Sequence, residues 1–253
     1  MGLFSFFTKE IAIDLGTANT VIFLDDKVVL DEPSIIAIET KTAKLVAIGN
    51  EAQLIEEHTN PRIYTIRPLM NGVIADYDAA EQMLTGFIRK AIGRKKTVFS
   101  PSLKTLIGIP GGSTPVDMRS IRDSASHAGA HEVVMVYEPM ASALGIGLDV
   151  TAPNGNMIVD IGGGTTDVAV ISLGGLVVSQ SVPVGGIRMD ETLMSYLKRE
   201  CNIIVGRQTA ENVKKDLATA IPLEEPRSIL IRGINQLNTS AGTVQFNSTQ
   251  AYE

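Results

Sequence analysis

Short apolar runs separated by polar tips dominate the first part of the chain. Two such runs, Ile11 to Asp14 and Val21 to Leu24, flank a polar tip and predict a hairpin. Further short strands are predicted at Ser34 to Ile38 and at Leu45 to Ile48. The stretch that follows has little periodicity, so we expect a small inserted subdomain at about residues 30–75.

Helical spacing begins after residue 79. Apolar residues recur every three or four positions over residues 79–92, which predicts an amphipathic helix. A strand is expected from Leu103 to Pro110. A helix is expected to follow, with Thr114 as its N-cap and Pro115 as its first residue. The remaining predicted elements are strands at 133–137, 157–160, 168–173, 176–184, 227–233 and 243–246, and helices at 138–148, 189–201 and 209–220.

The chain contains an internal repeat. The segments IAIDLGTANTVIFL, from Ile11, and MIVDIGGGTTDVAVISL, from Met157, share a strand, an aspartate, a glycine, a threonine-bearing tip and a second strand. Asp14 and Asp160 occupy equivalent places in the two copies. We therefore expect two lobes, each beginning with the same hairpin.

The residue types of the two tips suit a polyphosphate. Glycine lets backbone N–H groups approach phosphate oxygens, hydroxyls add donors, and the two aspartates suit a hydrated Mg²⁺. Either tip alone is equally typical of a tight turn, where Asp and Gly are favoured. The duplication favours phosphate binding, and neither a P-loop nor a Rossmann fingerprint occurs.

Composition limits the function classes. With 253 residues, 44% hydrophobic and 20% charged, the chain can bury a core of two lobes and is not a disordered protein. A net charge of −6 argues against a nucleic-acid-binding surface. A single cysteine, Cys201, and no apolar run near ~18 residues favour a cytoplasmic protein without a membrane span.

Five segments in order give the chain a family resemblance: IAIDLGTANT, YEPMASALG, DIGGGTTDVAVISLGG, VPVGGIRMDE and TAENVKKDL. From about residue 8 to about residue 235 the chain resembles the MreB family of bacterial actin homologues. The resemblance implies an α/β, actin-like ATPase fold with two lobes, each on a ribonuclease-H-like mixed sheet. It implies a first lobe at 1–148 and a second at 149–253, the latter divided into a base at 149–178 and a small subdomain at 179–253.

The resemblance also implies ATP and Mg²⁺ as ligands and assigns residues to them. Asp14 and Asp160 match the metal site, and Glu138 matches the residue that positions the attacking water, with Thr165 and Thr166 as the other catalytic candidates. From the residues alone, the favoured interpretation of Glu138 is an acidic residue at a helix N-terminus, stabilised by the helix dipole. The implied nucleotide contacts are Gly16, Thr17, Ala18, Asn19, Gly163, Gly164, Thr165, Thr166, Asp167, Glu211, Val213, Lys214, Lys215 and Asp216.

The partners implied by the resemblance are other copies of the chain, in filaments, and cell-wall synthesis proteins of the membrane. Apolar residues beside cations fit an anionic membrane surface at the inner face of the cell membrane: Phe4, Phe6, Phe7, Val98 and Phe99. The alternative is that these phenylalanines pack on the domain and that the cations Arg94 to Lys96 interact with a helix end.

Family members continue beyond the matched region, so the resemblance predicts a C-terminally truncated chain with an incomplete second lobe. ATP hydrolysis is expected for the full-length family member. The alternatives are a small-molecule kinase or an Hsp70-like chaperone ATPase on the same fold, or a non-functional fragment.

Overall fold

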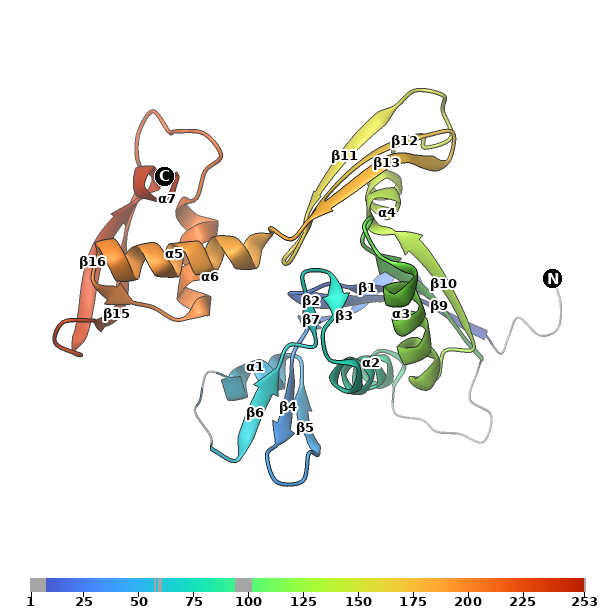
Figure 1. Cartoon of the computed structure of the whole chain (residues 1–253), viewed down its shortest axis with the longest axis horizontal. Coiled ribbons are helices and arrows are strands. Elements are labelled where there is room, and N and C mark those ends of the chain that lie inside the picture. Colours follow the sequence, from blue (N-terminus) through green and yellow to red (C-terminus); the bar gives the residue numbers. More distant parts are fainter. Residues whose placement is uncertain (1–7, 57, 59–60, 94–101, 253) are drawn as a thin grey trace. The chain divides into compact units, whose positions relative to one another are not determined.

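The computed structural model describes residues 8–252 except 57, 59–60 and 94–101. Its contacts form two compact units, Met1–Pro183 and Val184–Glu253, which are described separately below (Figure 1). Residues 149–183 group with the first unit, and the lobe boundary at residue 148 stays a prediction.

A five-stranded mixed sheet forms the centre of the first unit. Its order is β10-β9-β1-β2-β3, with β1 antiparallel to β2 and parallel to β9. The strands are β1 (Thr8–Leu15), β2 (Asn19–Leu24), β3 (Lys27–Pro33), β9 (Ser102–Ile109) and β10 (Glu132–Tyr137). The predicted hairpin is confirmed, because Ile11 pairs with Leu24 and Asp14 with Val21.

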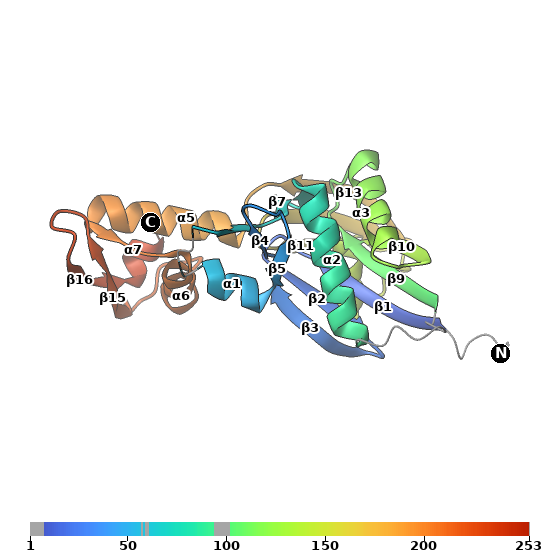
Figure 2. The same ribbon diagram turned by 90° about the horizontal axis from the view of Figure 1, so that it is seen from below.

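Two helices, α2 (Tyr77–Ile92) and α3 (Pro115–His127), cover one face of this sheet (Figure 2). The predicted apolar stripe of α2 is buried in the main core, through Met83, Leu84, Phe87 and Ile88. Thr114 caps α3 as predicted, in a reciprocal capping box with Asp117.

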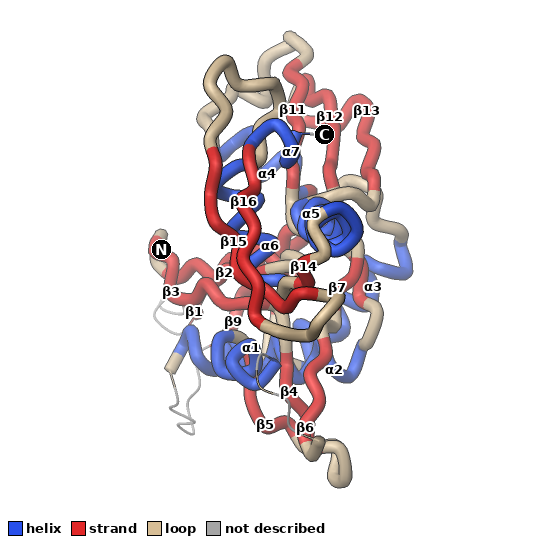
Figure 3. Tube along the Cα trace, turned by 90° about the vertical axis from the view of Figure 1, so that its left-hand side faces the viewer, coloured by secondary structure: helices blue, strands red, loops and turns tan. Residues whose placement is uncertain are grey.

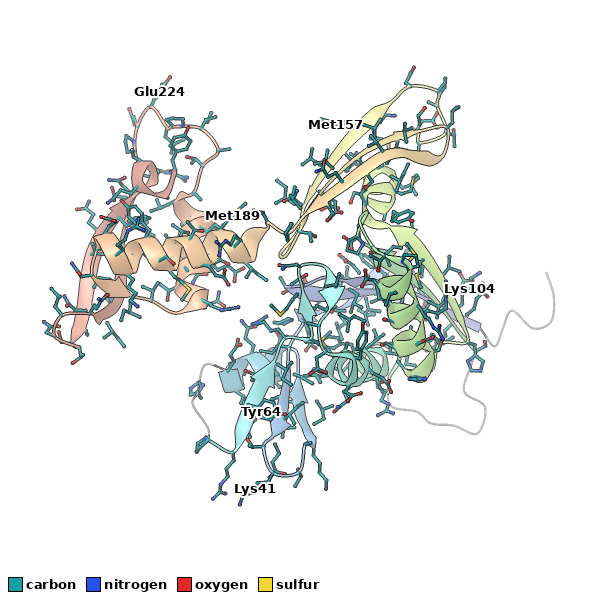
Figure 4. All side chains as sticks on the ribbon, viewed as in Figure 1. Lys41, Tyr64, Lys104, Met157, Met189 and Glu224 are labelled. Atoms are coloured by element: carbon teal, nitrogen blue, oxygen red, sulfur yellow. The ribbon has the colours of Figure 1, made fainter. Side chains whose placement is uncertain are left out.

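The insertion forms a separate three-stranded sheet, β5-β4-β6, with one short helix. Its elements are β4 (Ile36–Glu39), β5 (Leu45–Ile48), α1 (Asn50–Glu56) and β6 (Ile63–Ile66). Ile35, Ala37 and Ala52 belong to its small core, while Lys41 and Tyr64 are exposed (Figure 4). The chain then returns through a tight hairpin of β7 (Leu69–Met70) and β8 (Val73–Ile74).

A second, antiparallel sheet carries the other copy of the repeat. It consists of β11 (Asn156–Ile161), β12 (Thr166–Ser172) and β13 (Gly175–Val182). Helix α4 (Glu138–Gly145) packs on one face, where Ala143, Ile158 and Ile171 form a core. Met157 (labelled in Figure 4) is 68% exposed. The predicted helix end at residue 148 is wrong, because Gly147 adopts a positive φ of 78° and breaks the helical path.

The second unit packs two helices on another antiparallel sheet, of order β14-β15-β16, whose long strands β15 and β16 run side by side (Figure 3). Its elements are α5 (Gly186–Glu200), β14 (Ile203–Ile204), α6 (Arg207–Leu217), β15 (Ser228–Asn235), β16 (Ala241–Asn247) and α7 (Ser248–Tyr252). The core includes Leu197, Val213 and Phe246, with Tyr196 edge-on to Phe246 at a centroid distance of 5.8 Å. Cys201 is half-buried and free.

None of the helices in the described part of the chain combines the length and the apolar character that a membrane span requires.

Candidate functional site

The two tips of the internal repeat meet in the first unit. A Cβ atom added to Gly163 would lie 2.5 Å from the Cβ of Ala18, and one added to Gly164 would lie 2.6 Å from Thr17 Oγ1. Only glycine fits this approach, since real Cβ atoms do not come so close to other atoms. Two hairpins more than a hundred residues apart in sequence therefore build one site.

A third turn, which the sequence analysis missed, joins the tips. The Gly72 N–H donates a 3.0 Å hydrogen bond to Thr17 Oγ1. Asn71 and Gly72 both have positive φ, 51° and 77°, as in the two-residue turn of the β7–β8 hairpin. The Asn-Gly dipeptide between two apolar pairs was the signal that could have revealed this hairpin.

A cavity of about 490 Å³ opens at these tips, within the usual range for small-ligand sites. It lies on the first unit, and its lining includes ten of the predicted site residues: Asp14, Gly16, Thr17, Ala18, Asn19, Glu138, Asp160, Gly163, Gly164 and Thr165. The structure thus brings together the predicted phosphate tips, the predicted metal residues and the predicted catalytic glutamate.

Thr166 and Asp167 are not part of this lining. Thr166 pairs with Ile161 in the β11–β12 ladder. Asp167 is 2% exposed, and its Oδ1 accepts a 2.9 Å hydrogen bond from the Gly111 N–H, which fixes β12 to the turn after β9. A direct nucleotide contact of either residue stays a prediction.

Carboxyl groups concentrate in the cavity. Burial, and then the charge of Asp160, raise the pKa of Asp14. Burial, followed by the charges of Asp14, Asp167 and Asp160, raises the pKa of Glu138 to about 8. Because like charges oppose one another here, a cation among these groups would stabilise their ionised forms.

The protein groups at the cavity fit a Mg²⁺ ion that is bound partly through water better than a metal whose ligands all come from the protein. The described residues contain no cluster of three or more His, Cys, Asp or Glu placed to hold a metal ion. Two carboxylates, Asp14 and Asp160, face the cavity. Mg²⁺ usually keeps several waters and uses one or two carboxylates together with phosphate oxygens.

Glu138 lies opposite a glycine, Gly108. Glu138 is the first residue of α4, directly after β10, and a Cβ added to Gly108 would lie 3.4 Å from its Cγ. Ser142 follows four residues later, on the same side of α4, and its Oγ donates a 2.6 Å hydrogen bond to Asp160 Oδ2. Sequence analysis did not single out Ser142, since serine in a helix has no distinctive pattern.

The last five predicted nucleotide contacts, residues 211 and 213–216, lie on α6 of the second unit. Lys214 Nζ is 2.8 Å from Asp190 Oδ1 and donates to the Gly186 carbonyl at 3.0 Å, while Lys215 pairs with Glu211 at 2.7 Å. Val213 is 2% exposed in the core of that unit, and Asp216 is exposed. Nucleotide contacts of Glu211, Val213, Lys214, Lys215 and Asp216 stay predictions.

The predicted membrane residues Phe4, Phe6, Phe7, Val98 and Phe99 lie outside the described residues, as do Arg94 to Lys96.

The chain matches known proteins over nearly its whole length. The family model described as MreB/Mbl protein matches residues 8–253. The chain is 42% identical to the cell shape-determining protein MreB of Escherichia coli K12 over 98% of its own length and 72% of that protein.

Crystal structures of Spiroplasma citri MreB5 bound to AMPPNP and to ADP match with TM-scores of 0.86 and 0.87. Both are 34% identical to this chain and cover 96% of it, and the match spans 73% of each MreB5 chain. The family model covers nearly the whole chain, and the relative and the solved structures match over most of their own length, so the chain belongs to the MreB/Mbl family of actin-like cytoskeletal proteins.

Proposed function

We propose that this chain binds ATP with Mg²⁺ in the cavity of the first unit, and that nucleotide controls its assembly into filaments. The observation that carries the proposal is the meeting of the two repeat tips at one cavity with Asp14 and Asp160. The MreB5 relative was crystallised with AMPPNP and with ADP, which supports the same ligand class here.

The tips supply the phosphate contacts. Backbone N–H groups near Gly16 and Gly163 would donate to phosphate oxygens, and the absence of a Cβ at Gly163 lets the two tips come together. Thr17 Oγ1 already accepts a hydrogen bond from Gly72, so its hydroxyl hydrogen is left for a phosphate oxygen. Asp14 and Asp160 would hold Mg²⁺, which neutralises phosphate charge when it is bound.

Glu138 is the candidate for activating water. A half-buried carboxyl at the start of α4, in the wall of the cavity, can orient a water molecule and accept its proton once the group is ionised. Thr165 lines the same cavity and is placed to contact the water or the terminal phosphate. ATP hydrolysis accompanying assembly follows from these roles.

Cell-shape maintenance, through filaments at the inner face of the cell membrane that organise cell-wall synthesis, completes the proposal. Its support is membership of the MreB/Mbl family and the apolar residues Phe4, Phe6, Phe7, Val98 and Phe99 near cations. Family membership favours this function over a small-molecule kinase or an Hsp70-like chaperone ATPase.

The test of nucleotide binding is titration of a fluorescent ATP analogue into the full chain, with Mg²⁺ or with EDTA. We expect saturable, Mg²⁺-enhanced binding that Asp160→Asn weakens at least tenfold, a loss typical of groups that support a metal. Asp123→Asn, on the exposed surface of α3, is the matched control and should bind normally. Equal affinity of wild type and Asp160→Asn would contradict the assignment.

Assembly and membrane binding need separate measurements. We expect a larger fraction of the chain to sediment with Mg·ATP than with Mg·ADP. Deleting residues 2–7 and replacing Val98 and Phe99 with Ser should reduce binding to anionic vesicles. Unchanged vesicle binding would contradict the proposed membrane role but would not affect the proposal for the nucleotide site.

A further inference from the structure

A serine hydroxyl connects the helix of Glu138 with the strand of Asp160. Ser142 Oγ donates to Asp160 Oδ2 at 2.6 Å, a short distance typical of a hydrogen bond to an ionised carboxylate. Both residues line the cavity, so the bond lies in its wall. The family resemblance assigned no role to Ser142.

The helix that carries Ser142 is firmly placed. The neighbouring Ala143 is fully buried and packs with Ile158 and Ile171 of the small sheet. Helix α4 also contacts β9 and β10 of the central sheet. The hydroxyl is therefore delivered from a fixed backbone, and the freedom left to it is rotation about χ1.

The carboxylate that receives the bond has unfavourable neighbours. Asp14 and Glu138 line the same cavity as Asp160, so the three carboxylates repel one another when all are ionised. Without a fixed donor, the Asp160 side chain would gain by turning away from the other two. The Ser142 hydroxyl opposes this rotation, because it holds one carboxylate oxygen and leaves the other for a ligand.

We infer that Ser142 is a positioning residue for the divalent cation of the nucleotide, acting by holding Asp160 Oδ2 so that the second oxygen stays available to the cation and its waters. The inference rests on the proposed nucleotide site. It adds a residue that affects the cation requirement through its hydrogen bond to Asp160.

The experiment compares Ser142→Ala with wild type as full-length chains. The Mg²⁺ concentration for half-maximal binding of a fluorescent ATP analogue should rise about tenfold, as is typical when a partner of a metal-supporting group is removed. Affinity in EDTA should not change, since no cation is present. Mn²⁺ titration followed by electron paramagnetic resonance reads cation binding in the ternary complex directly and should show the same tenfold loss.

Conservative variants separate positioning from packing. Ser142→Thr keeps the hydroxyl and should retain the wild-type cation requirement, since Ser142 is half-buried rather than fully enclosed. Ser142→Cys keeps the size but has a weak donor, and should behave like Ser142→Ala. Ser120→Ala, which removes a helix serine bonded to the Val116 carbonyl on α3, is the matched control and should change nothing.

The outcomes are distinguishable. An unchanged cation requirement in both Ser142→Ala and Ser142→Cys, with normal Mg²⁺-dependent binding by wild type, overturns the inference alone. Equal losses in Ser142→Ala and Ser142→Thr also overturn it, because they indicate a packing role. Absence of Mg²⁺-dependent nucleotide binding by wild type overturns both the inference and the proposed function.

Discussion

Gly163 lies where a single methyl group would close the space between the two hairpin tips. We expect Gly163→Ala to weaken ATP binding strongly, because its Cβ would lie 2.5 Å from the Cβ of Ala18 and separate the tips. Overpacking of this kind costs about 1–3 kcal/mol of unfolding free energy. Urea unfolding and nucleotide titration check both effects.

The matched control is Gly145→Ala at the end of α4, where an added Cβ meets no atom within 4 Å. It should leave binding and stability unchanged or slightly improved. If Gly163→Ala bound nucleotide like Gly145→Ala, the close approach of the tips would have no part in binding.

Glu138 makes the stability of the ligand-free folded chain depend on pH. Its pKa is about 8 in the folded chain against an ordinary 4.5, so the folded state holds this proton over a range in which the unfolded state has lost it. Raising the pH from about 4.5 to about 8 therefore destabilises the ligand-free protein through this group. Glu138→Gln should unfold at higher temperature than wild type at pH 8.5, with a smaller difference at pH 5, and should hydrolyse ATP far more slowly.

Calorimetry at the two pH values, in EDTA, checks this prediction. Glu132→Gln is the control, since Glu132 lies at the exposed start of β10. A stability difference that does not grow with pH would contradict the raised pKa, whereas unchanged ATP hydrolysis would contradict the catalytic role.

At the scale of elements, the start of α3 is set by residues that are close together in the sequence. Thr114 and Asp117 each bond the other's backbone N–H, so the cap is complete within four consecutive residues and needs no tertiary contact. Thr114→Ala should lower the unfolding free energy by about 1 kcal/mol. Urea unfolding measures this, with Ser120→Ala on the same helix as the control; equal midpoints for the two variants would show that the cap contributes nothing.

Two of the elements that the sequence analysis missed, α1 and the β7–β8 hairpin, are short and depend on their surroundings. Helix α1 spans seven residues with Ala52 buried against the small insertion sheet, too little for a helical period to be visible. The β7–β8 hairpin has two-residue strands, and its turn is held by Thr17 and packed near Pro110. Such elements are stabilised by partners far away in the sequence, which no local pattern records.

At the scale of the whole molecule, ligand binding and folding are linked. A nucleotide that binds the folded chain alone adds about 2.7 kcal/mol to its stability at a concentration one hundred times its dissociation constant. We expect Mg·ATP to raise the urea midpoint of the wild-type chain and to raise that of Asp160→Asn much less. Equal shifts in the two proteins would place the bound nucleotide elsewhere.

The sequence by itself determined the hairpins of the repeat, the caps and the apolar stripes, because turns, caps and amphipathic faces depend on residues within one or two turns of each other. It also identified Asp14, Asp160 and the glycine tips as candidates, since the repeat marked them twice.

Only the tertiary structure decided that β1 pairs in parallel with β9, that the two tips touch, and that Gly72, Gly108 and Ser142 belong to the site. These contacts join residues far apart along the chain, and the pKa of Glu138 depends on burial and on three carboxylates brought from other strands. Their energies exist only once the core has packed, so they follow from three-dimensional proximity rather than from sequence pattern.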